Sequence, residues 1–342
     1  MDKSSKKCAN CGGNLVFSPK QNALLCEKCS SNTAIDLDKS KVIIKHDILD
    51  VKNLSTVKVE GGEANCPSCG AVVTNSKQLS NVCPYCGSNM VVNVKQENAI
   101  KCDAVIPFKI DKSELKDVYE QKIKHKHFIP NKLKKCPENS RIEAFYIPAF
   151  GFDASTINTY AGRLGKTYTD SNGNSRTKYF KISGTKQINI KDNLVETSSK
   201  LNQYDLDNIR PYNIKQSVPY NPDFIRGYSV EHYDKNLKDC FSASRISMKK
   251  IISDTILSGY SYDCVDYLNV DSSFSEEKYC QYILPVYQLN FNYKNKNYTT
   301  FVNGQTGKIG SGIPKSAVKI TFTVIFAILI FLAIVLLPML LN

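Results

Sequence analysis

The longest apolar run of the chain lies at its C-terminal end. Residues 320–341 include no charged side chain over 22 positions and are mostly Ile, Leu, Phe, Val and Ala. A helix rises about 1.5 Å per residue, so a helix of this length would cross a hydrocarbon core of about 30 Å. A buried core helix is the alternative, but such a helix is usually amphipathic and seldom this long. The pattern therefore predicts a transmembrane helix over residues 318–341.

Residues 98–312 contain shorter apolar runs whose spacing changes between that of helices and that of strands. The spacing predicts a helix that opens with Asp111 as N-cap and Glu114 at the capping-box position, and a second helix over about residues 235–258. Strands or hairpins are predicted at 104–108, 146–152, 178–190, 282–287 and 289–302, with a polar turn at 170–175. The elements predict an α+β body rich in antiparallel strands. Because a helix followed by strands occurs twice, their order suggests two related halves, 98–190 and 211–312.

The N-terminal part of the chain contains four Cys-x-x-Cys pairs. Their members are Cys8 and Cys11, Cys26 and Cys29, Cys66 and Cys69, and Cys83 and Cys86. The pairs form two groups, and about fourteen residues separate the two pairs of each group. This spacing is typical of tandem four-cysteine zinc ribbons, in which a β-hairpin brings two turns to one ion. Four thiolates close a tetrahedral site, so we predict two structural Zn²⁺ ions and no catalytic metal.

The residues around the cysteines predict ribbons over 1–35 and 63–95, joined by a linker over 36–62. Apolar residues at 15–17 and 23–25 flank a turn-rich segment, which predicts strand, turn and strand. A positive φ after the second cysteine of a pair turns backbone N–H groups toward sulfur. Gly12, Gly70 and Gly87 stand at this place, whereas Ser30 stands there after Cys29. Disulfide pairing is the alternative to metal binding, and iron, as in rubredoxin, is the alternative to zinc.

The formal net charge of +13 is typical of nucleic-acid-binding proteins, but it counts the cysteines as neutral. Eight thiolates and two Zn²⁺ ions together contribute −4, which leaves +9. The densest basic stretch contains Lys122, Lys124, Lys126, Lys132, Lys134, Lys135 and Arg141. It could face anionic lipid headgroups or phosphate. It could equally be the solvated face of a helix and its following loop.

The two ends of the chain indicate the same cellular location. Lys308, Lys315 and Lys319 precede the apolar run and only Asn342 follows it. The positive-inside rule then places the bulk of the chain in the cytoplasm and the C-terminus across the bilayer. Residues 1–7 are polar and no apolar stretch follows them, so no signal peptide is expected. Thiolate metal sites need a reducing compartment, and the cytoplasm is one.

No arrangement of residues indicates catalysis, and we predict that the protein is not an enzyme. Residues 304–308 resemble part of a phosphate loop, but two residues separate their glycines and Ile309 follows the lysine, which predicts a β-turn. His125 and His127 fall at a helix end, where their side chains diverge, and are expected on the surface. Five cysteines without pair spacing are expected to be buried free thiols: Cys102, Cys136, Cys240, Cys264 and Cys280.

Together these motifs resemble a family of bacterial membrane-anchored proteins with tandem transcription factor IIB-type zinc ribbons. The resemblance covers nearly the whole chain and rests on the ribbons (66–70 and 83–87 above all), 105–108, 146–150, 210–212, 303–308 with Pro314 after it, and the terminal helix. Where the family usually has a tryptophan, this chain has Ala149, Phe150 and Gly151. Members are often labelled primosomal or replication helicase-like, but a helicase needs an NTP site and the sequence shows none. The resemblance implies the zinc ligands, and it implies that some relatives work beside phage-shock and SPFH-type membrane-stress proteins.

Two functions follow from these expectations. The first is a cytosol-facing scaffold or adaptor whose ribbons and body recruit protein partners to the bilayer, in a membrane-stress complex if the resemblance extends that far. The second is nucleic-acid binding by ribbons that are tethered to the membrane. The first is preferred because the second ribbon is close to neutral and lacks the basic and aromatic stripe that nucleic acid needs. In that ribbon Lys77 and Lys95 are balanced by Glu63 and Glu97.

Overall fold

The computed structural model describes residues 7–37, 41–48, 62–65, 72–76, 78–82, 89–91, 102–198, 200–231 and 235–340; of those between 62 and 91 and those from 335 on, only the backbone is described. Its α-helices are α1 (Leu115–Ile123), α2 (Gln203–Ile209), α3 (Leu237–Leu257) and α4 (Ala317–Leu340), and its 3₁₀-helices are η2 (Asn131–Leu133), η3 (Ile214–Gln216) and η4 (Pro222–Ile225). Its strands are β1 (Leu15–Ser18), β2 (Ala23–Cys26), β3 (Asn32–Thr33), β4 (His46–Asp47), β5 (Gly62–Asn65), β6 (Val72–Ser76), β7 (Gln78–Val82), β8 (Asn89–Val91), β9 (Ala104–Val105), β10 (Arg141–Thr169), β11 (Ser175–Glu196), β12 (Val218–Pro219), β13 (Ser229–Glu231), β14 (Cys264–Tyr293) and β15 (Lys296–Asn303). The fold is α+β with mainly antiparallel sheets, as predicted.

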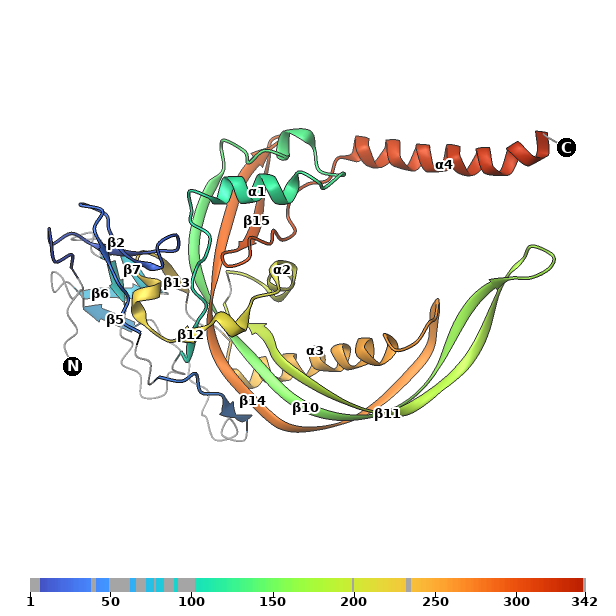
Figure 1. Ribbon diagram of the computed structural model, residues 1–342, viewed down its shortest axis with the longest axis horizontal. Helices are drawn as coiled ribbons and strands as arrows, with labels where there is room; N and C mark the ends of the chain where they lie inside the picture. Colours follow the sequence, from blue (N-terminus) through green and yellow to red (C-terminus); the bar gives the residue numbers. More distant parts are fainter. Residues whose placement is uncertain are drawn as a thin grey trace.

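Three very long strands form the centre of the fold. β10 pairs antiparallel with β11 along one edge and with β14 along the other. β10 and β11 are joined by a turn that places Thr169 opposite Ser175, which confirms the predicted turn at 170–175. In Figure 1 these strands form one curved band that continues beyond the rest of the body to the tip of the hairpin. Segments from both predicted halves of the body therefore belong to the same sheet.

The turns of the two long hairpins are built by side chains suited to them. At the tip of β10 and β11, Asp170 Oδ1 accepts hydrogen bonds from the backbone N–H groups of Asn172 and Asn174, at 3.0 and 2.9 Å. Between β14 and β15, Lys294 and Asn295 both have positive φ, 51° and 59°. Two consecutive residues with positive φ match the right-handed twist of paired strands. The second hairpin, predicted over 289–302, is thereby confirmed.

α3 lies along the concave face of the long sheet (Figure 1). Its N-cap is Asn236, whose Oδ1 accepts a hydrogen bond from the backbone N–H of Asp239 at 2.8 Å. Apolar residues of the helix pack against apolar residues of the sheet in one core cluster: Leu237, Cys240, Met248, Ile252 and Ile256 against Phe150, Phe152, Ile188 and Ile190. The helix predicted over 235–258 is confirmed, and its burial explains why it lies on this face.

Two local predictions about the start of the body were wrong. α1 begins later than predicted, because Asp111 closes a separate turn and accepts a hydrogen bond from the backbone N–H of Ser113 at 2.9 Å. Glu114, at the residue before the helix, makes no side-chain capping bond. β9 is shorter than the strand predicted over 104–108. The N–H of Ile106 still donates to the carbonyl of Ile283 at 3.0 Å, but Pro107 has no N–H to continue the ladder. The N–H of Phe108 donates to the hydroxyl of Tyr146 at 3.2 Å.

α4 extends away from the body in Figure 1. In its first 18 residues, 317–334, none is buried against the rest of the described chain. Phe322, Phe326 and Phe331 are 70%, 64% and 66% exposed. The helix matches the predicted span, and by length and composition it is able to cross a membrane.

Candidate metal centre

The first two cysteine pairs lie on two tight turns at one end of the β1–β2 hairpin. The backbone N–H of Gly12 donates to the carbonyl of Cys8 at 2.8 Å, and that of Ser30 donates to the carbonyl of Cys26 at 2.9 Å. Gly12 and Ser30 have φ values of +69° and +58°. Both turns therefore use the left-handed conformation that the spacing predicts, and a serine adopts it in the second.

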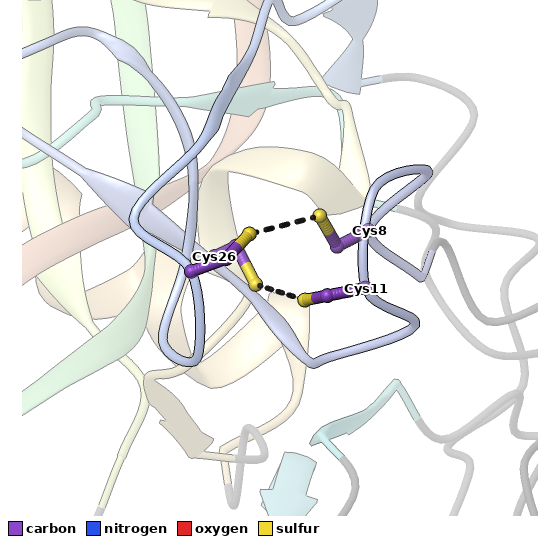
Figure 2. Close-up of side chains that lie close together, drawn as sticks. Cys8, Cys11 and Cys26 are labelled. Atoms are coloured by element: carbon purple, nitrogen blue, oxygen red, sulfur yellow. Dashed lines mark hydrogen bonds between the residues drawn. The ribbon is translucent and has the colours of Figure 1, made fainter.

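These turns bring four sulfur atoms together, and Figure 2 shows Cys8, Cys11 and Cys26 facing one another. The Sγ of Cys8 lies 3.5 Å from that of Cys29, and the Sγ of Cys11 lies 3.5 Å from that of Cys26. All four sulfurs lie within 4.8 Å of one another. With metal–sulfur bonds of about 2.3 Å, the sulfurs of a tetrahedral site are about 3.8 Å apart. The cluster could therefore hold one metal ion.

Gly13 leaves the sulfurs the space that they occupy. A Cβ at this position would lie 2.9 Å from the Sγ of Cys26 and 3.3 Å from the Sγ of Cys11. The turn itself needs only Gly12, so a second glycine directly after it is a signal that the sequence analysis did not use. Any side chain at position 13 would displace two ligand atoms.

Ser31 lies between two of the sulfurs, and the sequence analysis missed it as well. Its Oγ is 3.0 Å from the Sγ of Cys8 and 3.1 Å from that of Cys29. This hydroxyl is the main reason why the pKa of Cys8 is lowered to about 6 and the pKa of Cys29 is also lowered. The N–H of Gly13 lowers the pKa of Cys11, but hydrogen bonds to neighbouring thiols outweigh it and raise that pKa to about 12. Four adjacent thiols resist full ionisation unless a cation compensates their charge.

The donor set determines what this centre can do. Four thiolates from Cys8, Cys11, Cys26 and Cys29 suit a soft divalent ion, and both zinc and iron accept this set. No coordination position would remain for water or substrate, so a bound ion would hold the two turns together and would not activate a reactant. The second predicted group, Cys66, Cys69, Cys83 and Cys86, lies outside the described residues.

The β1–β2 hairpin of the predicted first ribbon packs directly on the body. The N–H of Phe17 donates to the carbonyl of Arg226 at 3.0 Å. The ring of Phe17 packs edge-on against that of Phe224 in η4, with ring centroids 5.2 Å apart. Both side chains are 2% exposed, and the ribbon's apolar residues belong to the same core cluster as those of α1 and β14. The sequence contains no pattern that reveals this contact, because it joins segments distant in the chain.

Backbone segments within the predicted second ribbon also meet the main sheet. β7 and β8 pair antiparallel, and β7 pairs with β13 through Val230 opposite Ser80. β13 in turn pairs with β10. The segment predicted as the linker contributes β4, which pairs with β14. Lys45, beside β4, forms ion pairs with Asp153 and Asp192, at 2.6 and 2.8 Å, that sequence reasoning missed.

Among the described residues, none of the remaining candidates belongs to the four-cysteine cluster. His125 and His127 are exposed, as predicted, after the end of α1. A turn at 304–308 is confirmed, but it is wider than the predicted β-turn, because the N–H of Gly307 donates to the carbonyl of Asn303, four residues earlier, at 2.9 Å. Three of the five single cysteines are buried, namely Cys136, Cys240 and Cys280, whereas Cys102 is half-buried. Cys264 is exposed at the start of β14, so the prediction that it is buried was wrong.

The chain is similar over nearly its whole length to a bacterial protein. Uncharacterized protein YdjG of Bacillus subtilis (strain 168) is 23% identical over 330 residues, which cover 92% of this chain and 92% of YdjG. No protein-family profile matches the chain. No solved structure matches it either.

Proposed function

We propose that the protein is a single-pass membrane protein that recruits protein partners to the cytoplasmic face of a bilayer. The observation that carries the proposal is α4, whose first 18 residues are strongly apolar on average and include no buried residue in the described chain. An apolar surface of this size in water needs a cover of lipid or protein, and the length of the helix suits lipid. The lysines before the helix support a cytoplasmic body.

We further propose zinc at the four-cysteine cluster and a second zinc at Cys66, Cys69, Cys83 and Cys86. The closed donor set of the first cluster supports a structural ion there. The packing of the β1–β2 hairpin on η4 supports a role in shaping the body. A rigid body on a membrane anchor, with metal sites that leave no position for a reactant, suits an adaptor better than an enzyme.

The outer face of the long sheet offers a surface for protein partners. Arg163 and Tyr267 are opposite each other on β10 and β14, and the guanidinium of Arg163 lies 5.0 Å from the ring centre of Tyr179 on β11. Tyr179 and Tyr267 are 49% and 42% exposed, and Ile157 on the same face is 55% exposed. Tyrosine and arginine are the residues that most often dominate binding at protein interfaces. α3 covers the opposite face, so this one is open to a partner.

The hairpin tip limits how the body can lie against a bilayer. In Figure 1 the tip of β10 and β11 extends to the same side of the body as α4. The tip carries Lys166, Asp170 and Arg176, and hydrocarbon excludes such charges. With α4 inserted, the tip must stay in water.

Affinity capture of the full-length protein from detergent-solubilised membranes, with and without nuclease, tests the recruitment of proteins. The expected result is a discrete, nuclease-resistant set of proteins, identified by mass spectrometry. The double substitution Tyr179→Ala/Tyr267→Ala should lose this set, and Tyr204→Ala, at a 68% exposed tyrosine on α2, should keep it. Recovery dominated by nucleic acid and lost with nuclease would favour the alternative function.

A separate experiment tests the anchor. The intact chain should stay in the membrane fraction after alkaline carbonate extraction. A chain that ends at residue 312 should lose this resistance. Extraction of the intact chain by carbonate would refute the membrane anchor, whatever the capture experiment shows.

A further inference from the structure

The basic stretch whose role the sequence leaves open lies at the foot of α4. The backbone N–H of Ser316 donates to the carbonyl of Phe128 at 2.7 Å. The Nζ of Lys319 donates to the carbonyl of Ile129 at 2.9 Å and to Oδ1 of Asn131 at 2.7 Å. Figure 1 shows the loop after α1 beside the start of α4. Because the charge-free run starts directly after Lys319, this loop touches the chain where the proposed span begins.

The loop carries an excess of positive charge. Residues 121–137 include six lysines and two histidines but no Asp or Glu. Five of the lysines are exposed: Lys122, Lys124, Lys126, Lys132 and Lys135. The sixth, Lys134, donates to the carbonyl of Lys124 at 2.9 Å. The nearest acid on α1, Glu120, accepts a hydrogen bond from the N–H of Cys136, and within the described part of the chain none of the six lysines forms an ion pair.

Packing holds this charged loop in place. Ile123, Ile129 and Leu133 are buried, and the hydroxyl of Tyr119 donates to the carbonyl of Leu133 at 2.9 Å. Phe128 lies between the lysines and is 39% exposed. A fixed backbone thus presents lysines and one aromatic ring together. This combination suits the headgroup region of a bilayer, where amines meet phosphate and the ring reaches the acyl boundary.

We propose that the lysines of residues 122–135, together with the exposed Lys315, bind the anionic phospholipid headgroups of the bilayer that α4 enters. The proposal rests on the proposed membrane anchor. Each lysine near an anionic surface strengthens binding about fivefold, and the effect decays over about 8–10 Å at physiological salt. The contacts of Ser316 and Lys319 keep the loop close to the surface at any tilt of α4. The patch then orients the body on the membrane and gives it a preference for anionic lipid.

Site-resolved labelling of the full-length protein in nanodiscs tests the proposal. One set of discs contains phosphatidylcholine alone, and the other also contains phosphatidylglycerol. An amine-reactive reagent modifies the lysines, and mass spectrometry reports the rate at each site. At low salt, Lys124, Lys126 and Lys132 should react about fivefold more slowly in the anionic discs, and high salt should remove the difference. Lys178 and Lys181, exposed on β11, serve as controls whose rates should not change.

Charge reversal sharpens the test. Lys124→Glu/Lys126→Glu should remove the protection of Lys132, whereas the matched variant Lys178→Glu/Lys181→Glu should keep it. Equal rates at Lys132 in both kinds of disc would overturn the proposal. Equal protection by inorganic phosphate with neutral discs would also overturn it, in favour of a phosphate site. Protein that does not co-elute with the discs would refute the membrane anchor and this proposal with it, so the two failures are distinguishable.

Discussion

The contact between the β1–β2 hairpin and the body leads to a prediction that distinguishes a docked hairpin from an independent module. Phe17 is 2% exposed and its ring packs on that of Phe224, 5.2 Å away between centroids. Phe17→Ala removes a buried aromatic side chain, which typically costs about 3–5 kcal/mol, and an edge-on ring pair accounts for about 0.5–1.5 kcal/mol of it. A protein of this size loses about 2–4 °C in Tm per kcal/mol. For a cost of about 3 kcal/mol, we therefore expect the Tm to fall by about 6–12 °C.

The assay is thermal unfolding in a mild neutral detergent, monitored by circular dichroism. Hydrogen exchange across η4 is measured in a separate experiment. Exchange in Pro222–Ile225 should become faster in the variant, because η4 loses its cover. Metal content should not change, because Phe17 is not a ligand. Tyr168→Ala is the control, since Tyr168 is 50% exposed at the hairpin tip and such surface changes stay within about 0.5 kcal/mol. A Tm of Phe17→Ala within about 1 °C of the unsubstituted protein would refute the docked hairpin.

Three further predictions concern the metal centre and the core. Gly13→Ala should lower the metal content measured by mass spectrometry, because the new Cβ would lie 2.9 Å from the Sγ of Cys26. Iodoacetamide at pH 8 should alkylate the exposed Cys264 but not Cys280, because burial raises the pKa of Cys280 to about 12 and keeps it protonated. Tyr146→Phe should lower the free energy of unfolding by about 1–3 kcal/mol, because the buried hydroxyl donates to a carbonyl of η4 at 3.1 Å.

Two of these predictions have a matched control variant, and the exposed Cys264 is the internal control for Cys280. Gly259→Ala meets its nearest atom only at 3.4 Å and should keep the full metal content. Tyr204→Phe changes a hydroxyl on a 68% exposed side chain and should leave the unfolding free energy unchanged. Full metal content in Gly13→Ala would contradict the first prediction, and alkylation of Cys280 in the folded protein would contradict the second. An unchanged free energy of unfolding in Tyr146→Phe would contradict the third.

The position of the lysine-rich segment next to α4 is visible only in the tertiary structure. In the sequence Lys122 and Lys135 are far from the apolar run, and a solvated surface is the simplest interpretation of them. The contact between Ser316 and Phe128 changes this interpretation, because it places the lysines beside the start of α4. Exposed lysines in water need no partner, but lysines beside a proposed bilayer surface can bind anionic lipid headgroups.

The sequence alone was enough to predict features that depend on neighbouring residues. The spacing of Cys8, Cys11, Cys26 and Cys29 predicts the cluster, because two short turns on one hairpin determine where the sulfurs lie. The apolar period predicts α3, the polar residues predict the turns of both hairpins but not the length of β10 and β11, and composition predicts α4. The predicted start of α1 was wrong because the side chain of Asp111 can either cap a helix or close a short turn. Both are local hydrogen bonds, and the sequence does not show which one forms.

Only the tertiary structure decided how these elements meet. The alternation in β10 and β14 indicates strands but does not indicate that Tyr146 lies opposite Pro285, because the strand period is the same for every partner. The docking of Phe17 on η4, and the position of the lysines at the foot of α4, likewise join segments that are distant in the chain. Such contacts form where two complementary surfaces bury apolar area and satisfy hydrogen bonds together. The periodicity within one segment does not show which other segment it contacts.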